Sequence, residues 1–85
     1  MKTFRYVVQD PVGLHARPAG MLVKEAGKGA CSVTIESKGK SADAKRLLAV
    51  MGLGVTKGDE ISITVEGKDE EAVAAALEAF CKENL

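Results

Sequence analysis

Three short segments of the chain alternate between apolar and polar side chains, and this alternation limits the possible folds more than any other feature of the sequence. It is clearest in residues 61–66, where a branched apolar residue occupies every second position, and it recurs in residues 31–36 and 4–8. A side-chain period of two is the pattern of a β-strand with one buried and one exposed face. The sequence therefore predicts a sheet that is covered on one side.

Two further segments repeat their apolar residues at the spacing of a helix. The first is expected to be a helix over residues 16–28, which glycine residues then end. Its apolar stripe consists of Ala19, Leu22, Val23 and Ala26. In the second segment, Asp69 is placed to cap a helix whose first turn is acidic. The buried face predicted for this C-terminal helix consists of Val73, Ala76, Leu77 and Phe80.

Between these helices the sequence indicates a hairpin and a short helix. Lys38 and Gly39 suit the hairpin turn, and the returning strand over residues 40–44 is weakly apolar, so we expect it at an edge of the sheet. Residues 45–54 are long enough for about two helical turns before glycines end them. The element order β-α-β-β-α-β-α predicts one α+β domain over residues 1–85, with an antiparallel sheet and the helices on one face. The strand order stays open.

Composition argues against several classes of function. The formal net charge is zero and Trp is absent, so basic surface and stacking platforms for nucleic acid are scarce. No apolar run approaches the roughly 20 residues that span a bilayer, and the first residues form no signal-peptide core, so we expect a cytoplasmic protein without membrane insertion. Cys31 and Cys81 are expected to be reduced thiols in or near the core, and one histidine cannot complete a metal site. Nothing demands more than a monomer.

The neutral total conceals two oppositely charged parts. Residues 15–57 carry eight basic and three acidic side chains, whereas residues 58–85 carry two basic and eight acidic ones. Such a division is common on solvated surfaces that bind nothing. It also suits a basic docking face for an acidic partner, and the charges alone do not decide between the two interpretations.

The residues that carry chemistry lie in the segment Gly-Leu-His-Ala-Arg-Pro-Ala at positions 13–19. Because a helical stripe begins directly after it, His15 is expected at the N-cap, with Ala16 and Arg17 at the first two helical positions. Free N–H groups and the helix dipole favour an anion there, above all phosphate. Arg17 can fork onto phosphate oxygens, and a neutral imidazole is a nucleophile. No glycine-rich nucleotide loop is present, so something other than a nucleotide bound to this chain has to bring the phosphoryl group, and no cofactor is expected.

This segment resembles the active-site motif of HPr, the histidine-containing phosphocarrier of the bacterial phosphoenolpyruvate-dependent sugar phosphotransferase system. The resemblance extends to the length of the chain, the element order and residues 47–54. It implies an open-faced two-layer sandwich, a four-stranded antiparallel sheet with three helices on one face. It also implies that enzyme I phosphorylates Nδ1 of His15, and that the phosphoryl group passes to sugar-specific IIA proteins or domains. In this interpretation Arg17 orients the phosphate, the backbone amides of Ala16 and Arg17 assist, and the carrier is not itself an enzyme.

The same resemblance implies a docking face for these partners, formed by two helices. Its expected members are Gly20, Met21 and Lys24 on the first helix and Leu47, Leu48, Met51 and Gly54 on the second. A helix of two turns cannot turn all of its apolar residues inward. We therefore expect Leu47, Leu48 and Met51 to be partly exposed beside His15 rather than core residues.

Arg46 departs from the pattern of many relatives, which carry a regulatory serine at this position. Arginine has no hydroxyl, so that phosphorylation switch is not expected here, and Ser41 on a predicted strand is a poor substitute. Two other interpretations stay open beside the phosphocarrier. One is a regulatory adaptor that binds partners through the two helices, and the other is a small ligand-binding module without covalent chemistry.

Overall fold

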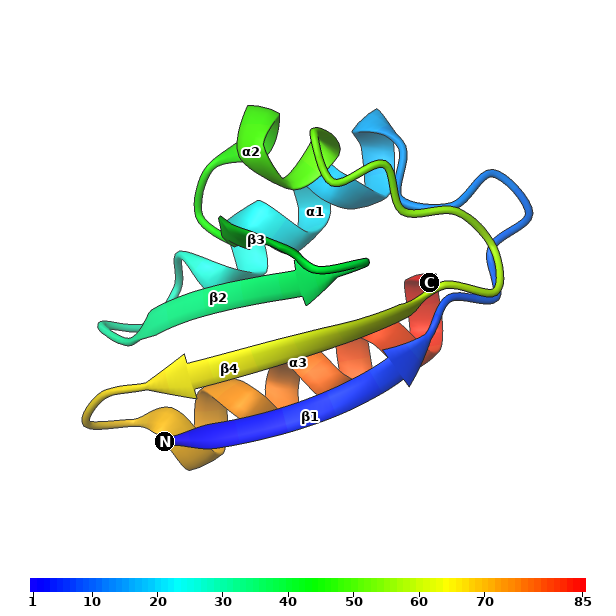
Figure 1. Ribbon diagram of the computed structural model, residues 1–85. Coiled ribbons are helices and arrows are strands. Elements are labelled where there is room, and N and C mark those ends of the chain that lie inside the picture. Colours follow the sequence, from blue (N-terminus) through cyan, green and yellow to red (C-terminus); the bar gives the residue numbers. More distant parts are fainter.

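The chain forms two layers, a four-stranded sheet and three helices that cover one of its faces (Figure 1). The structure is a computed structural model and describes residues 1–85. Its elements are β1 (Lys2–Val7), α1 (Ala16–Ala26), β2 (Ser32–Ser37), β3 (Lys40–Asp43), α2 (Leu47–Met51), β4 (Glu60–Glu66) and α3 (Glu70–Asn84). The strand order is β1-β4-β2-β3, and each neighbouring pair is antiparallel. The predicted α+β class, element order and edge position of β3 are confirmed.

The sheet is buried on one face because its strands alternate. In β4 the side chains of Ile61, Ile63 and Val65 are fully buried. Ile63 lies opposite Phe4 of β1 and Ile35 of β2, so apolar side chains meet across three strands on the helix side. The polar residues between them are more exposed and form the second, open face. The structure is thus the open-faced sandwich that the sequence analysis predicted.

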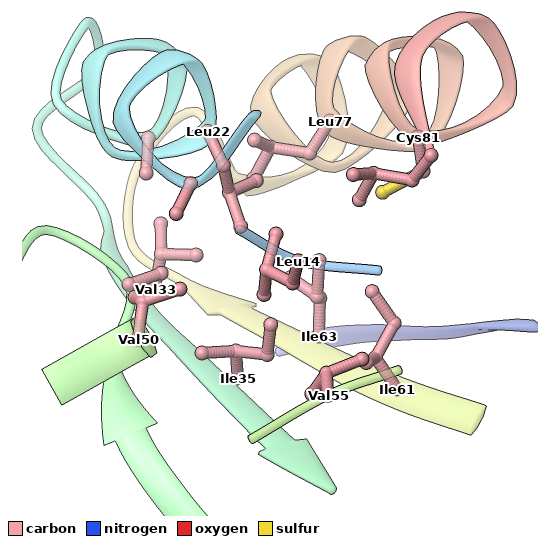
Figure 2. Close-up of a cluster of buried hydrophobic side chains, with 14 of the residues drawn as sticks. Leu14, Leu22, Val33, Ile35, Val50, Val55, Ile61, Ile63, Leu77 and Cys81 are labelled. Carbon is pink, nitrogen blue, oxygen red and sulfur yellow. The ribbon is translucent and has the colours of Figure 1, made fainter. Parts of the chain in front are cut away.

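The core fills the space between the sheet and the helices (Figure 2). Leu22 of α1 and Leu77 of α3 project toward Ile35 and Ile63 of the sheet. Leu14, the residue before the single histidine, lies within this cluster and is only 5% exposed. Its burial attaches the beginning of α1 firmly to the core.

The helix predicted over residues 45–54 is shorter than expected. Only Leu47–Met51 is helical, because a turn that starts at Asp43 comes first and places Arg46 in an extended conformation with φ of −118°. The carbonyl oxygen of Asp43 accepts the N–H of Arg46 at 3.0 Å, and its Oδ1 atom accepts the N–H of Lys45 at 2.9 Å. These bonds compete with the first helical turn, so the prediction of two turns was wrong.

Helix α3 buries most of the predicted face: Leu77 is buried, and Val73 and Phe80 are partly buried against the core. Ala76, assigned to the core, is exposed, because the row of Leu77 and Cys81 faces the sheet instead. Asp69 occupies the expected N-cap, but its side chain makes no capping bond. The side chain of Glu70 accepts the N–H of Gly67, which precedes the helix. No helix in the structure has the length and apolarity to cross a membrane.

Both cysteines are free and buried in the core, as the sequence predicted. Burial raises the pKa of the Cys81 thiol to about 12, with a smaller contribution from the nearby charge of Glu78. A thiol with such a pKa stays protonated at neutral pH and is a poor nucleophile. Cys81 therefore serves as a small apolar core residue.

Candidate functional site

A turn at Asp10 leads the chain from β1 toward α1. The Oδ1 atom of Asp10 accepts the N–H of Val12 at 2.8 Å, and its carbonyl oxygen accepts the N–H of Gly13 at 3.0 Å. Asp, Pro and Gly are favoured at the first, second and fourth positions of such a turn, and Pro11 and Gly13 fit that pattern. The N–H of Asp10 also donates to the main-chain oxygen of Leu85 at 2.7 Å. The turn is therefore attached to the end of α3.

Gly13 allows the chain to pass very close to the loop between α2 and β4. Its φ is +80°, and a Cβ atom here would lie 2.5 Å from the carbonyl oxygen of Val55 and 2.7 Å from Cα of Thr56. The next residue, Leu14, donates its N–H to the same Val55 oxygen at 3.0 Å. Because backbone lies against backbone, only glycine fits at this position. The contact fixes the path of the chain directly before His15.

His15 occupies the N-cap of α1, where the sequence placed it. Its backbone is extended, and its carbonyl oxygen accepts the N–H of Ala19 at 2.9 Å, which is the first hydrogen bond of the helix. The imidazole makes no capping hydrogen bond, so its ring nitrogens are available for other chemistry. The N–H groups of Ala16 and Arg17 precede the first helical bond and point toward any anion bound there.

A shallow pocket of about 300 Å³ opens beside the histidine. It is lined by Asp10, His15, Arg17, Pro18, Met21 and Asn84. His15 is partly exposed and Arg17 is exposed, so a partner protein can reach both side chains. Arg17 forms no ion pair with any carboxylate, which leaves its guanidinium free to bind phosphate oxygens.

Two residues of this pocket escaped the sequence analysis. Asp10 belongs to the turn after the first strand, and its Asp-Pro-x-Gly pattern was the available signal. Asn84 comes from the end of α3, far from His15 in sequence, and the fold alone brings it here. Its Nδ2 atom donates to the carbonyl oxygen of Phe80 at 3.1 Å, which fixes the side chain at the rim.

Helices α1 and α2 pack against each other beside the pocket and expose a group of apolar side chains. We call Met21, Leu47, Leu48 and Met51 the α1–α2 patch. Leu48 is 83% exposed, and the other three are 37% to 43% exposed. Val50, by contrast, is fully buried. The expected exposure of Leu47, Leu48 and Met51 is confirmed.

The other residues expected on the docking face also lie at the surface. Gly20 is half-buried, and Lys24 and Gly54 are exposed. Arg46 is exposed at the N-cap of α2, and its side chain makes no capping bond. The patch therefore has basic side chains at its margin.

A side-chain cluster supports the loop between α2 and β4, which contacts Gly13 and Leu14 directly before His15. Nζ of Lys38 lies 2.8 Å from Oδ2 of Asp59 and donates to the carbonyl oxygen of Gly54 at 3.0 Å. The same Oδ2 atom accepts the N–H and the hydroxyl of Thr56 at 2.8 and 3.0 Å. The hydrogen bond from Lys38, followed by those from Thr56, holds the pKa of Asp59 below its usual range. We call this arrangement the Lys38–Asp59 brace.

A protein-family match covers nearly the whole chain. The model described as the PTS HPr component phosphorylation site matches residues 2–83. The chain belongs to the HPr family. The phosphocarrier protein HPr of Lysinibacillus sphaericus is 40% identical over 83 residues, which cover 98% of this chain and 94% of that protein. The phosphocarrier protein HPr of Mycoplasma genitalium is 39% identical over 85 residues, or 99% of this chain and 97% of that protein.

Structural comparison agrees with the HPr assignment. A solved histidine-containing phosphocarrier protein of mycoplasma matches with a TM-score of 0.93 and 34% identity, and the match covers 96% of this chain and 93% of that one. The HPr family is a phosphocarrier family of the phosphotransferase system. The resemblance found around His15 is therefore confirmed at the level of the family. In the structure, no group of three or more His, Cys, Asp or Glu side chains is placed to hold a metal ion.

Proposed function

We propose that this HPr chain accepts a phosphoryl group on His15 from enzyme I and passes it to IIA components of sugar transport. The observation that supports this most is the uncapped imidazole at the N-terminus of α1, beside a pocket that contains the unpaired Arg17. Phosphoenolpyruvate is the original donor, and a phosphohistidine of enzyme I is the immediate one. The chain turns over only together with these partner phosphotransferases.

The transfer step uses the lone pair of one imidazole nitrogen. This nitrogen of His15 attacks the phosphorus atom, a new N–P bond forms, and the N–P bond of the donor breaks. The bonding electron pair returns to the imidazole of the donor, and transfer to a IIA protein reverses the roles. Arg17 and the N–H groups of Ala16 and Arg17 stabilise the negative oxygens, because all of them lie at the positive end of α1.

Docking uses the α1–α2 patch together with the basic residues around it. On α1, Arg17 and Lys24 lie about one turn to either side of Met21, and Arg46 directly precedes Leu47 at the start of α2. Such a surface suits a partner with an apolar centre and an acidic rim, because opposite charges steer the encounter while apolar contacts hold the complex. Most acidic side chains belong to residues 58–85, whereas this docking surface is formed by residues within 17–54, where the charged side chains are mainly basic.

Intact-mass spectrometry tests the proposal. The chain is incubated with phosphoenolpyruvate, Mg²⁺ and a bacterial enzyme I, and a sample is then treated briefly with acid. An increase in mass by one phosphoryl group that is lost after acid treatment indicates a phosphohistidine, and His15 is the only histidine. His15→Ala should fold and show no gain, whereas Arg46→Ala should show one. No gain on the unaltered chain with enzyme I from several bacteria would contradict the proposal and favour a binding adaptor.

A further inference from the structure

Asp10 lines the same pocket as His15 and Arg17, and nothing in the proposed function uses its carboxylate. We propose that this carboxylate destabilises the phosphorylated form of His15 and thereby keeps the transfer potential of the phosphoryl group high. The inference rests on the proposed function, because it concerns the phosphorylated state of the same site.

The side chain of Asp10 is held in place by its surroundings. Its Oδ1 atom accepts the N–H of Val12 at 2.8 Å, while the backbone of Asp10 bonds to Gly13 and to Leu85 at 3.0 and 2.7 Å. Asp10 is partly buried, so solvent screens its charge less than on an open surface. The negative charge therefore stays at the pocket when the state of His15 changes.

Phosphorylation changes the charge balance of this pocket. Before transfer the charged side chains that line the pocket are the carboxylate of Asp10 and the guanidinium of Arg17. A phosphoryl group on His15 adds up to two negative charges, which Arg17 attracts and Asp10 repels. Asp10 takes part in no ion pair, so no cation held against it cancels this repulsion. The repulsion raises the free energy of the phosphorylated form alone, and transfer to an acceptor relieves it.

A carrier has to release its phosphoryl group as readily as it takes it. A pocket with only Arg17 and free N–H groups would bind the phosphoryl group and make its transfer less favourable. Asp10 offsets part of that attraction without touching the nucleophilic nitrogen. Its role is therefore to adjust the transfer equilibrium, while the folding of the site depends on its hydrogen bonds.

The chain contains a matched control for this charge. Asp43 forms the same turn before α2: its Oδ1 atom accepts the N–H of Lys45 at 2.9 Å, and its carbonyl oxygen accepts the N–H of Arg46 at 3.0 Å. Asp43 lines a separate hollow between β3 and α2 rather than the pocket of His15. Asparagine at either position keeps the acceptor of the turn and removes one negative charge. Asp10→Asn and Asp43→Asn thus make the same chemical change, but only Asp10→Asn removes a charge from the pocket of His15.

The test measures an equilibrium, because an equilibrium constant does not depend on how well enzyme I docks. Each variant is mixed with catalytic enzyme I, Mg²⁺ and a series of pyruvate-to-phosphoenolpyruvate ratios, and intact mass gives the phosphorylated fraction. Asp10→Asn should raise the ratio at half-phosphorylation about three- to tenfold, the scale of one charge at a partly exposed site. Asp43→Asn should leave it within about twofold, and added salt should shrink the Asp10 effect.

Asp10→Glu separates the charge from the turn. It keeps the negative charge on a longer side chain, so its half-phosphorylation ratio should stay near that of the unaltered chain. A shift in Asp10→Glu equal to that of Asp10→Asn, or equal shifts in Asp10→Asn and Asp43→Asn, would overturn the inference. An unchanged ratio in Asp10→Asn, with normal phosphorylation of the unaltered chain, overturns the inference alone. Failure of the unaltered chain to accept phosphate overturns the proposed function and the inference together.

Discussion

The two helices beside the pocket begin with the same turn but continue differently. Asp10 and Asp43 each bond to the backbone two and three residues ahead. Before α2 the turn ends directly at the N-cap, Arg46, whereas before α1 two further residues, Leu14 and His15, follow the turn. Leu14 is buried and His15 is partly exposed. The two extra residues before α1 therefore have separate roles: Leu14 attaches the start of the helix to the core, and His15 presents its side chain at the N-cap.

The surroundings of the two starts differ as well. The chain before α1 is held by two hydrogen bonds: the N–H of Asp10 donates to the main-chain oxygen of Leu85, and the N–H of Leu14 donates to the carbonyl oxygen of Val55. The chain before α2 lies next to the edge strand β3 and exposes Arg46 and Leu47. The first start is therefore suited to hold a reacting group in position, and the second is suited to present a surface.

The largest expected effect is on stability, and it concerns the fourth residue of each turn, Gly13 before α1 and Arg46 before α2. Gly13→Ala should lower the free energy of unfolding by about 3 kcal/mol, because alanine is strained at φ of +80° and its Cβ would collide with the backbone of Val55. Arg46→Ala, at the corresponding position, should change it by less than about 0.5 kcal/mol, since Arg46 is exposed with negative φ. Urea unfolding of both variants measures this. Equal stability of the two would show that the close approach at Gly13 is not required.

The second difference should appear in the rate of phosphorylation. Arg17→Ala should slow phosphoryl uptake about 10- to 100-fold, the value of one charge-assisted hydrogen bond in the transfer state. Arg46→Ala removes the same charge from the start of α2 and should slow uptake far less. Because Arg17 is exposed and unpaired, its variant should unfold at the same urea concentration as the unaltered chain. A destabilised Arg17→Ala would mean that Arg17 has a structural role instead.

Helix α2 gives a third contrast, between its exposed and buried residues. Leu48→Ala should raise the KM for the chain as a substrate of enzyme I about three- to tenfold, with kcat and stability unchanged, because Leu48 is 83% exposed. Val50→Ala should instead lower the free energy of unfolding by about 2 kcal/mol, because Val50 is fully buried. Steady-state kinetics and urea unfolding separate the two effects. A normal KM in Leu48→Ala would exclude this residue from the docking contact.

The start of α1 could be predicted from the sequence because its signals are local. The apolar stripe of Ala19, Leu22 and Ala26 fixes where the helix lies, and His15 therefore falls at the N-cap. The alternation in β2 and β4 was equally local and gave the buried face of the sheet correctly. The length of α2 was overestimated because the hydrogen bonds that Asp43 accepts from Lys45 and Arg46 are not visible in apolar spacing.

The rest of the site depends on contacts between distant parts of the chain. The pairing of β1 with β4 joins two strands that are far apart in the sequence, and no periodicity within either strand specifies that partner. The same topology places Asn84 and Asp10 at one pocket. A sequence pattern can therefore single out His15 as the candidate for phosphorylation, while the position of Asp10 beside it follows only from the fold of the chain.

The smallest effect should come from the Lys38–Asp59 brace, which supports the start of α1 but not that of α2. Lys38→Met should lower the urea midpoint slightly near neutral pH and speed hydrogen exchange of the Leu14 amide, while exchange of the Val50 amide in α2 stays the same. Lys45→Met, which loses a lysine outside any ion pair, is the control.

Acid provides an independent check on this brace. The pKa of Asp59 is lowered in the folded chain, chiefly by the hydrogen bond from Lys38, so the stabilisation is complete above the ordinary carboxyl pKa. It disappears as the pH falls through the lower pKa of the folded state. The difference in urea midpoint between Lys38→Met and the unaltered chain should therefore shrink between about pH 7 and about pH 3. A difference that stays constant over this range would mean that Lys38 acts through its bond to the Gly54 carbonyl oxygen, which does not titrate, rather than through Asp59.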